Sequence, residues 1–149
     1  MLLAAPNQWV HLDCSLAYDP DPSVLISKVI ATDYCSRSEC PNFEAFVNDI
    51  FEGDQDLISY VQRAIGYSLT GSTNAQCLFI LIGDGANGKS TFVNVISKLL
   101  GDYSKAAASQ TLIARGSTSV GDDLVDLVGA RFIPVSETEE GEALAEAKI

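Results

Sequence analysis

The chain has 149 residues, of which 47% are hydrophobic and 19% charged, so it can build a packed core and is not a disordered chain. Its 20 acidic residues outnumber the 9 basic ones and no cluster of lysine or arginine occurs, so its net charge of −11 argues against a surface that holds a nucleic-acid backbone by itself. No apolar run approaches the roughly 18 residues of a membrane span, and the N-terminus lacks the basic region of a signal peptide, so we expect a cytoplasmic protein without a membrane partner.

The first 34 residues favour short strands and turns. Residues with high β-propensity are concentrated in 9–12 and in 24–31, and the sequence Asp-Pro-Asp-Pro over 19–22 interrupts the chain between them. We therefore predict two strands in this part of the chain, separated by a turn.

Two amphipathic helices are predicted next. Apolar residues at helical spacing over 43–51 indicate a helix that begins after Pro41. Asp54 is placed to cap a second helix, whose apolar stripe runs over 57–69 and whose end is marked by Gly71. Both stripes are typical of core packing and carry no functional signal of their own.

The cysteines suggest a reducing compartment, because they show no disulfide pattern. A zinc site is the alternative interpretation, but the spacing within the second pair is loose and no tight Cys-x-x-Cys pair occurs. Unpaired buried thiols are the commoner case. The residues concerned are His11 with Cys14, Cys35 with Cys40, and the separate Cys77.

A change of pattern follows the polar segment 71–76. Residues 77–82 are apolar throughout, as expected for a parallel strand covered on both faces. The sequence Gly-x-x-x-x-Gly-Lys-Ser comes next at 83–90, and a helix is predicted over 90–100 with Gly101 as its C-terminal stop. The side chains predicted to face inward from this helix are Val93, Ile96, Leu99 and Leu100.

The glycine-rich turn between a strand and a helix matches the P-loop pattern. Glycines let the backbone wind so tightly that its N–H groups point at a phosphate, and the following helix adds its positive end. In such a loop Lys89 reaches the β- and γ-phosphates, and the Ser90 hydroxyl can bind Mg²⁺. The residues predicted to bind a nucleoside triphosphate are Gly83, Asp84, Gly85, Ala86, Asn87, Gly88, Lys89, Ser90 and Thr91.

Hydrolysis of a triphosphate needs a second acidic position at the end of a neighbouring strand. Residues 103–113 are ambiguous, 121–127 favour a short helix, and 131–135 predict a second buried strand. This strand leads to Glu137, which we assign as magnesium ligand and as the base that polarises the attacking water.

The assignment of Glu137 leaves alternatives. Ser136 occupies the position where an aspartate is often found, and Ser136 with Glu139 also fits a helix capping box. Glu139 or Glu140 could therefore be the catalytic carboxylate instead.

Three separated motifs resemble the phage and plasmid primase–helicase family, superfamily 3 helicases related to the poxvirus primase–helicase. Gly-x-x-x-Asn-Gly-Lys-Ser-Thr occurs at 83–91, and Gly-Ala-Arg-Phe-Ile-x-Val-Ser-Glu-Thr-Glu-Glu-Gly at 129–141. Upstream, Cys-Pro at 40–41 precedes Asp-Leu-Ile-x-Tyr-x-Gln-x-Ala-x-Gly-Tyr-Ser-Leu-Thr-Gly at 56–71. The motifs occur in order and cover nearly the whole chain.

The resemblance implies an α/β fold. Residues 77–149 would form an AAA+-like P-loop core with a parallel sheet, truncated at its C-terminus, and 1–71 a small module of β-structure and helices. It also implies an ATPase that forms a ring, usually a hexamer, and drives along single-stranded DNA during replication, with ATP and Mg²⁺ as ligands. Lys89, Ser90 and Glu137 take the phosphate-binding, magnesium-binding and Walker B positions.

Other elements of the family are expected outside this chain. The polar sensor, the arginine finger and the DNA-binding hairpin would lie beyond residue 149, and the primase domain far upstream. Two further functions fit the loop alone. One is a small-molecule or nucleoside kinase, in which Arg115 would be the lid arginine, and the other is a nucleotide-binding fragment without turnover.

Overall fold

The chain begins with an antiparallel meander of three short strands in the order β1-β2-β3. The computed structural model describes residues 1–108 and 122–135. Leu3 of the first strand pairs with Val10 of the second, which pairs with Ala17 of the third. The second strand confirms the prediction over 9–12. The strands are β1 (Leu2–Ala4), β2 (Trp9–His11) and β3 (Leu16–Tyr18).

Residues 24–31 form no strand, so this prediction was wrong. The backbone N–H of Ile30 donates to the carbonyl oxygen of Ala4 (2.9 Å), and the next N–H, of Ala31, donates to Leu99 (2.9 Å) near the end of α3 (Lys89–Leu100). A strand needs a ladder of bonds to one neighbour. Here successive N–H groups bond to two different segments, and the chain ties the sheet to α3.

The two predicted amphipathic helices are confirmed. The first, α1 (Pro41–Ile50), has its proline at the first helical position, where the missing N–H costs nothing. The second, α2 (Gln55–Thr70), is capped by the Asp54 carboxylate, which accepts hydrogen bonds from two backbone N–H groups of the first turn, each at 3.0 Å. Gly71 ends it in a left-handed conformation with φ 65°.

Helix α3 buries one stripe of its surface. Phe92, Ile96 and Leu100 are buried, and Val93 packs against them. Leu99, however, is 46% exposed, contrary to the prediction that it faces inward. The core covers the side of α3 that carries Phe92, Ile96 and Leu100, whereas Leu99 stays exposed within the described part of the chain.

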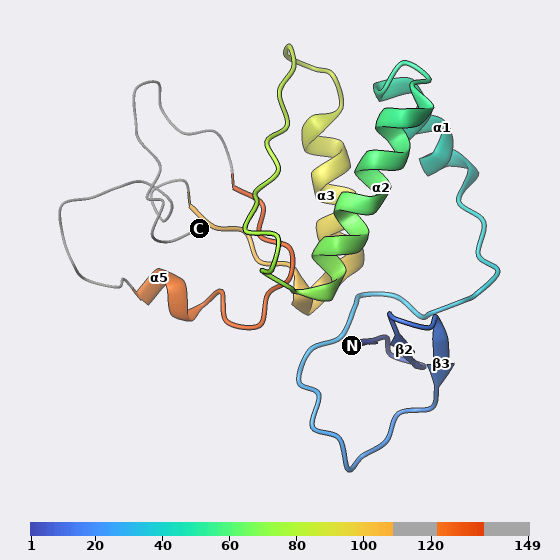
Figure 1. The fold of residues 1–149 in the computed structure, drawn as a ribbon, viewed down its shortest axis with the longest axis vertical. Coiled ribbons are helices and arrows are strands. Elements are labelled where there is room, and N and C mark those ends of the chain that lie inside the picture. Colours follow the sequence, from blue (N-terminus) through green and yellow to red (C-terminus); the bar gives the residue numbers. More distant parts are fainter. Residues whose placement is uncertain (109–121, 136–149) are drawn as a thin grey trace.

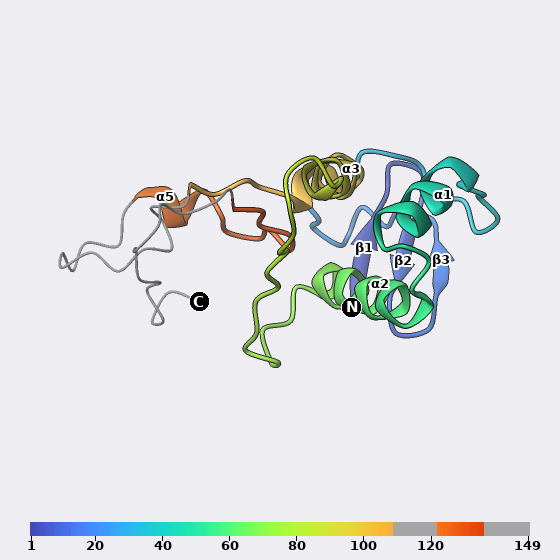
Figure 2. The ribbon, with the colours of Figure 1, turned by 90° about the horizontal axis from the view of Figure 1, so that it is seen from above.

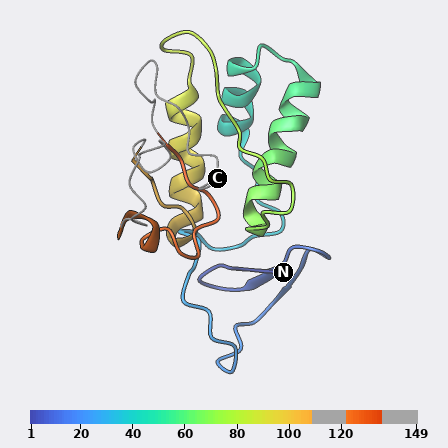
Figure 3. The same ribbon diagram turned by 60° about the vertical axis from the view of Figure 1, so that its left-hand side comes forward.

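One hydrophobic core joins residues from both sides of the boundary predicted at 71–76. Helices α1, α2 and α3 lie side by side, with the small sheet at one end of this layer (Figures 1, 2 and 3). The Phe92 ring stacks on Phe43 and meets Phe51 edge-on, with ring centroids 6.2 and 6.0 Å apart. The buried residues of the core are Leu3, Ala5, Ile30, Val47, Phe92, Ile96, Leu100 and Tyr103.

Two segments in the C-terminal half lie beside each other in parallel. The 3₁₀ helix η1 (Gly101–Tyr103) leads into residues 104–107, which form parallel bridges with 132–135. The hydrogen bonds run from the N–H groups of residues 105 and 107 to the carbonyl oxygens of residues 132 and 134, at 3.1 and 3.0 Å. The helix predicted over 121–127 is the single turn α5 (Asp122–Val125), with residue 121 outside the described part.

The strand predicted over 77–82 is not formed. Its residues belong to no regular element, and Ile80 and Ile82 are 68% and 89% exposed. A β-strand is stabilised by backbone hydrogen bonds to a neighbouring strand. Within 1–108 and 122–135, no segment pairs with residues 77–82. The parallel P-loop sheet over 77–149 therefore stays a prediction.

Arg131 connects three segments that are far apart in the sequence. Its Nη1 donates to the carbonyl oxygen of Leu69 at the end of α2, and its Nη2 to that of Leu2 in β1, both at 2.8 Å. The guanidinium also lies 4.3 Å from the centre of the Tyr103 ring. These contacts satisfy a carbonyl oxygen at the helix end and fasten the sheet and α2 to the start of 132–135.

We expect Arg131→Ala to lower the free energy of unfolding by about 2–4 kcal/mol, because two charge-assisted hydrogen bonds and one cation–π contact are lost. Urea denaturation followed by circular dichroism measures this change. Arg63→Ala is the matched control, since Arg63 lies exposed on α2, and it should change the free energy by less than about 0.5 kcal/mol. An equal effect of the two substitutions would contradict the role of Arg131.

Candidate phosphate-binding site

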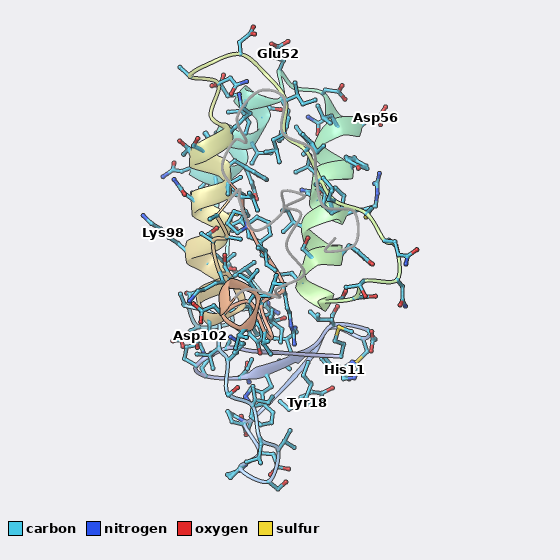
Figure 4. All side chains as sticks on the ribbon, turned by 90° about the vertical axis from the view of Figure 1, so that its left-hand side faces the viewer. His11, Tyr18, Glu52, Asp56, Lys98 and Asp102 are labelled. Carbon is cyan, nitrogen blue, oxygen red and sulfur yellow. The ribbon has the colours of Figure 1, made fainter. Side chains whose placement is uncertain are left out.

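The glycine-rich loop 83–88 lies at the N-terminal end of α3, away from the sheet (Figures 1 and 3). Figure 4 shows Glu52, in the turn between α1 and α2, at this end of the molecule, and His11 at the sheet end. Residues 83–87 are exposed, and Gly88 is half-buried. The loop is therefore open to a ligand from solvent.

Among the described residues, the N–H groups at the start of α3 have no acceptor outside the helix. Ala86 and Gly88 both have a left-handed backbone, with φ 60° and 85°. Gly88 is the N-cap of α3 and supplies no side-chain acceptor. The N–H groups of the first helical turn have no acceptor within the helix, and they carry the positive end of the helix dipole. This arrangement favours an anion.

Gly88 fits against α1 only because it lacks a side chain. A Cβ at this position would lie 2.6 Å from Ile50 Cγ2 and 3.3 Å from Phe46 Cε2. Its positive φ also disfavours any other residue. The end of the loop is therefore seated on the C-terminal half of α1, which sets the position from which α3 begins.

The Lys89 side chain folds back over the loop. Its Nζ donates to the carbonyl oxygens of Gly83 (2.6 Å) and Asp84 (2.8 Å) and to Asn87 Oδ1 (2.8 Å). The ammonium is therefore enclosed by two carbonyl oxygens and one amide oxygen of the loop that leads into α3. A cation on a loop that ends at an uncapped helix start supplies donors of the kind that suit a phosphate chain.

The structure brings together part of the predicted site. Gly83, Asp84, Asn87 and Lys89 meet around the ammonium, whereas the side chains of Ser90 and Thr91 are exposed on the first turn of α3. Gly85 and Ala86 are exposed in the same turn, and Gly88 is the N-cap of α3. Five further candidates lie outside the described part of the chain: Arg115, Ser136, Glu137, Glu139 and Glu140. The segment that leads to them is described as far as residue 135, where it pairs with 104–107.

The cysteines are free, as predicted, but exposed and not buried. They lie in turns and connecting segments, where little apolar structure covers them. Desolvation and the nearby Glu44 carboxylate raise the pKa of the Cys40 thiol, which makes it a poorer metal ligand. Among the described residues, no group of three or more histidine, cysteine, aspartate or glutamate side chains is placed to hold a metal ion.

Sequence reasoning missed two sets of contacts, one that positions the loop and one that fastens the fold elsewhere. Phe46 and Ile50 were predicted only as part of a core stripe, yet they form the seat of Gly88. Arg131 was not predicted as a contact at all, because a single arginine before an apolar segment gives no pattern that points to carbonyl oxygens elsewhere.

Within the described ranges, none of the helices has the length and apolar character needed to cross a bilayer.

Comparison with known proteins points to helicases. No protein-family model matches the chain. The chain is 27% identical, over 149 residues, to a protein of Acanthamoeba polyphaga mimivirus named "Putative helicase L207/L206". The match covers 96% of this chain, which spans only 15% of the length of that relative. At this identity the similarity supports a helicase-like relationship.

Proposed function

We propose that this chain carries the nucleotide-binding part of an ATP-dependent DNA helicase of the phage and plasmid primase–helicase type. The observation that supports this most directly is that the Lys89 ammonium is held within a loop that has the P-loop sequence and that leads into the uncapped start of α3. The similarity to a protein named as a helicase supports the same class of activity.

In this proposal the chain holds the triphosphate of ATP with its loop. The free N–H groups at the start of α3 bind phosphate oxygens, and Lys89 contacts the β- and γ-phosphates. Ser90 is placed on the first helical turn, where its hydroxyl can bind magnesium. A bound magnesium ion would neutralise charge on the phosphates. Glu137 would polarise the attacking water, and its carboxylate would help to hold the metal.

The negative charge of the chain indicates that the nucleotide site and the proposed DNA contacts lie in different parts of a larger protein. A single loop lysine with helical N–H groups is enough for a phosphate chain, but binding to a DNA backbone needs many basic side chains. This chain carries a net charge of −11, and the turn next to the loop holds Glu52 (Figure 4). We therefore assign single-stranded DNA binding, and the ring assembly that would enclose DNA, to parts of a larger protein.

A nucleotide-binding unit without turnover is the second candidate for the chain as it stands. The observation that favours it is that segment 77–82 pairs with no segment within 1–108 and 122–135, whereas a complete P-loop sheet would need it as a central strand. Binding of a triphosphate needs only the loop and α3, whereas hydrolysis also needs Glu137 held at a defined distance from them.

We expect Lys89→Ala to weaken MgATP binding by about 100-fold or more, because the phosphates lose a charge-assisted contact that the neighbouring backbone cannot replace. Isothermal titration calorimetry measures the dissociation constant. Lys98→Ala is the matched control, since Lys98 is an exposed lysine in the last turn of the same helix. If both variants bind MgATP like wild type, the loop does not hold the phosphates.

In a longer form of the protein that hydrolyses ATP, Glu137→Gln should reduce the rate of hydrolysis by about 10²-fold or more, the effect of losing a positioned base. Binding of ATP should stay close to that of wild type, because the amide keeps the shape of the carboxylate. Glu139→Gln is the comparison. If Glu137→Gln hydrolyses ATP normally and Glu139→Gln does not, the catalytic base is Glu139 and not Glu137.

The 149-residue chain should show no appreciable binding to single-stranded DNA at physiological salt, because its charge opposes that of the phosphate backbone. Fluorescence anisotropy with a labelled oligonucleotide across a salt series is the measurement. Tight binding that weakens steeply with salt would instead place a DNA-binding surface within this chain.

A further inference from the structure

The Asn87 side chain lies between Lys89 and Gly83. Its Oδ1 accepts a hydrogen bond from Lys89 Nζ at 2.8 Å. Its Nδ2 occupies the space in front of the Gly83 Cα, so that a Cβ added to Gly83 would collide with this nitrogen. Asn87 is exposed, and its amide is held at this place by the lysine and by the bare surface of the glycine.

These contacts use all the hydrogen-bonding capacity of the lysine. An ammonium group has three N–H donors, and Lys89 gives one each to the carbonyl oxygens of Gly83 and Asp84 and to the Asn87 amide. A phosphate oxygen can therefore reach the ammonium with full hydrogen-bond geometry only where one of these three acceptors withdraws.

The three acceptors differ in how easily they can leave. The carbonyl oxygens of Gly83 and Asp84 belong to the backbone, which must rewind to move them. The Asn87 amide is attached through two rotatable side-chain bonds and is exposed to solvent, where water can replace the lost hydrogen bond. The amide is thus the acceptor that exchanges at the smallest cost.

We propose that Asn87 is a placeholder for a phosphate oxygen. In the free loop its Oδ1 fills the position on Lys89 that a phosphate oxygen takes, and its amide group closes the space in front of Gly83. Arrival of a triphosphate displaces the amide and opens that space. Asn87 thus occupies one hydrogen-bonding position of Lys89 before the ligand arrives and competes with the phosphate for it. This inference rests on the proposed phosphate binding at the loop.

The proposal predicts opposite results for two substitutions at the same position. Asn87→Ala removes the competing acceptor, so the affinity for MgATP should stay within about threefold of wild type or increase, as the net value of one hydrogen bond allows. Asn87→Asp places a carboxylate on the ammonium, where it competes with phosphate and repels it. Affinity should then fall by about 10-fold or more.

Ala86→Asp serves as the control for charge alone. It adds the same negative charge one residue away, at a left-handed position that aspartate tolerates. Ala86 is not one of the three acceptors of Lys89 Nζ, which belong to Gly83, Asp84 and Asn87. Its loss of affinity should be smaller than that of Asn87→Asp. Calorimetry with MgATP and with magnesium triphosphate gives the affinities, and thermal melting followed by circular dichroism verifies that each variant is folded.

A spectroscopic signature separates exchange from a merely structural role. In protein labelled with ¹⁵N-asparagine, the side-chain amide signal of Asn87, assigned by its absence in Asn87→Ala, should move when MgATP binds. In Lys89→Ala the signal should move in the same direction without nucleotide, because the amide has lost the same partner. Wild type and Lys98→Ala should share one position for this signal.

The outcomes distinguish this proposal from the proposed function. If wild type binds MgATP but Asn87→Ala weakens binding by 10-fold or more, or if the Asn87 signal does not respond to nucleotide, the placeholder role is wrong and phosphate binding stands. If wild type binds neither MgATP nor triphosphate, the proposed function is wrong, and the placeholder role is wrong with it.

Discussion

Helix α3 is held at both of its ends by glycines that leave no room for a side chain. At the start, Gly88 is seated on Ile50 and Phe46 of α1. At the end, a Cβ on Gly101 would lie 2.9 Å from both Ala31 N and Val29 O. Between these points the stripe Phe92, Ile96 and Leu100 is buried. Because the interior is close-packed, α3 cannot slide along its axis or turn about it without creating overlap at one end and a void at the other.

The position of the loop follows from this restraint on α3. The loop enters the helix at Gly88 and is closed by Lys89, so both the free N–H groups and the ammonium move with the helix. Helix α1 and the segment 29–31 contain no candidate phosphate ligand, yet they supply the surfaces against which the two ends of α3 pack. Their role in the proposed function is to keep the anion-binding end of α3 at one place relative to the rest of the fold.

Predictions that rest on short-range chemistry agree with the structure. The Asp54 cap, the Gly71 stop and Pro41 at the first helical position each act within one turn of a helix, and all three are confirmed. Predictions that need a distant partner agree less well. Residues 24–31 have the composition of a strand but bond to two different segments. Residues 77–82 also have the composition of a strand, but no described segment pairs with them.

The sequence by itself determined the helices and the joining of the loop glycines and Lys89 in one turn before α3, because caps, apolar periodicity and the glycine–lysine spacing act between near neighbours. Tertiary structure alone decided which surface seats Gly88 and why Leu99 is exposed. It also joined Arg131 to carbonyl oxygens 62 and 129 residues away. A carbonyl oxygen is present in every residue, so the identity of a partner leaves no trace in the sequence, and only the packing of distant segments selects it.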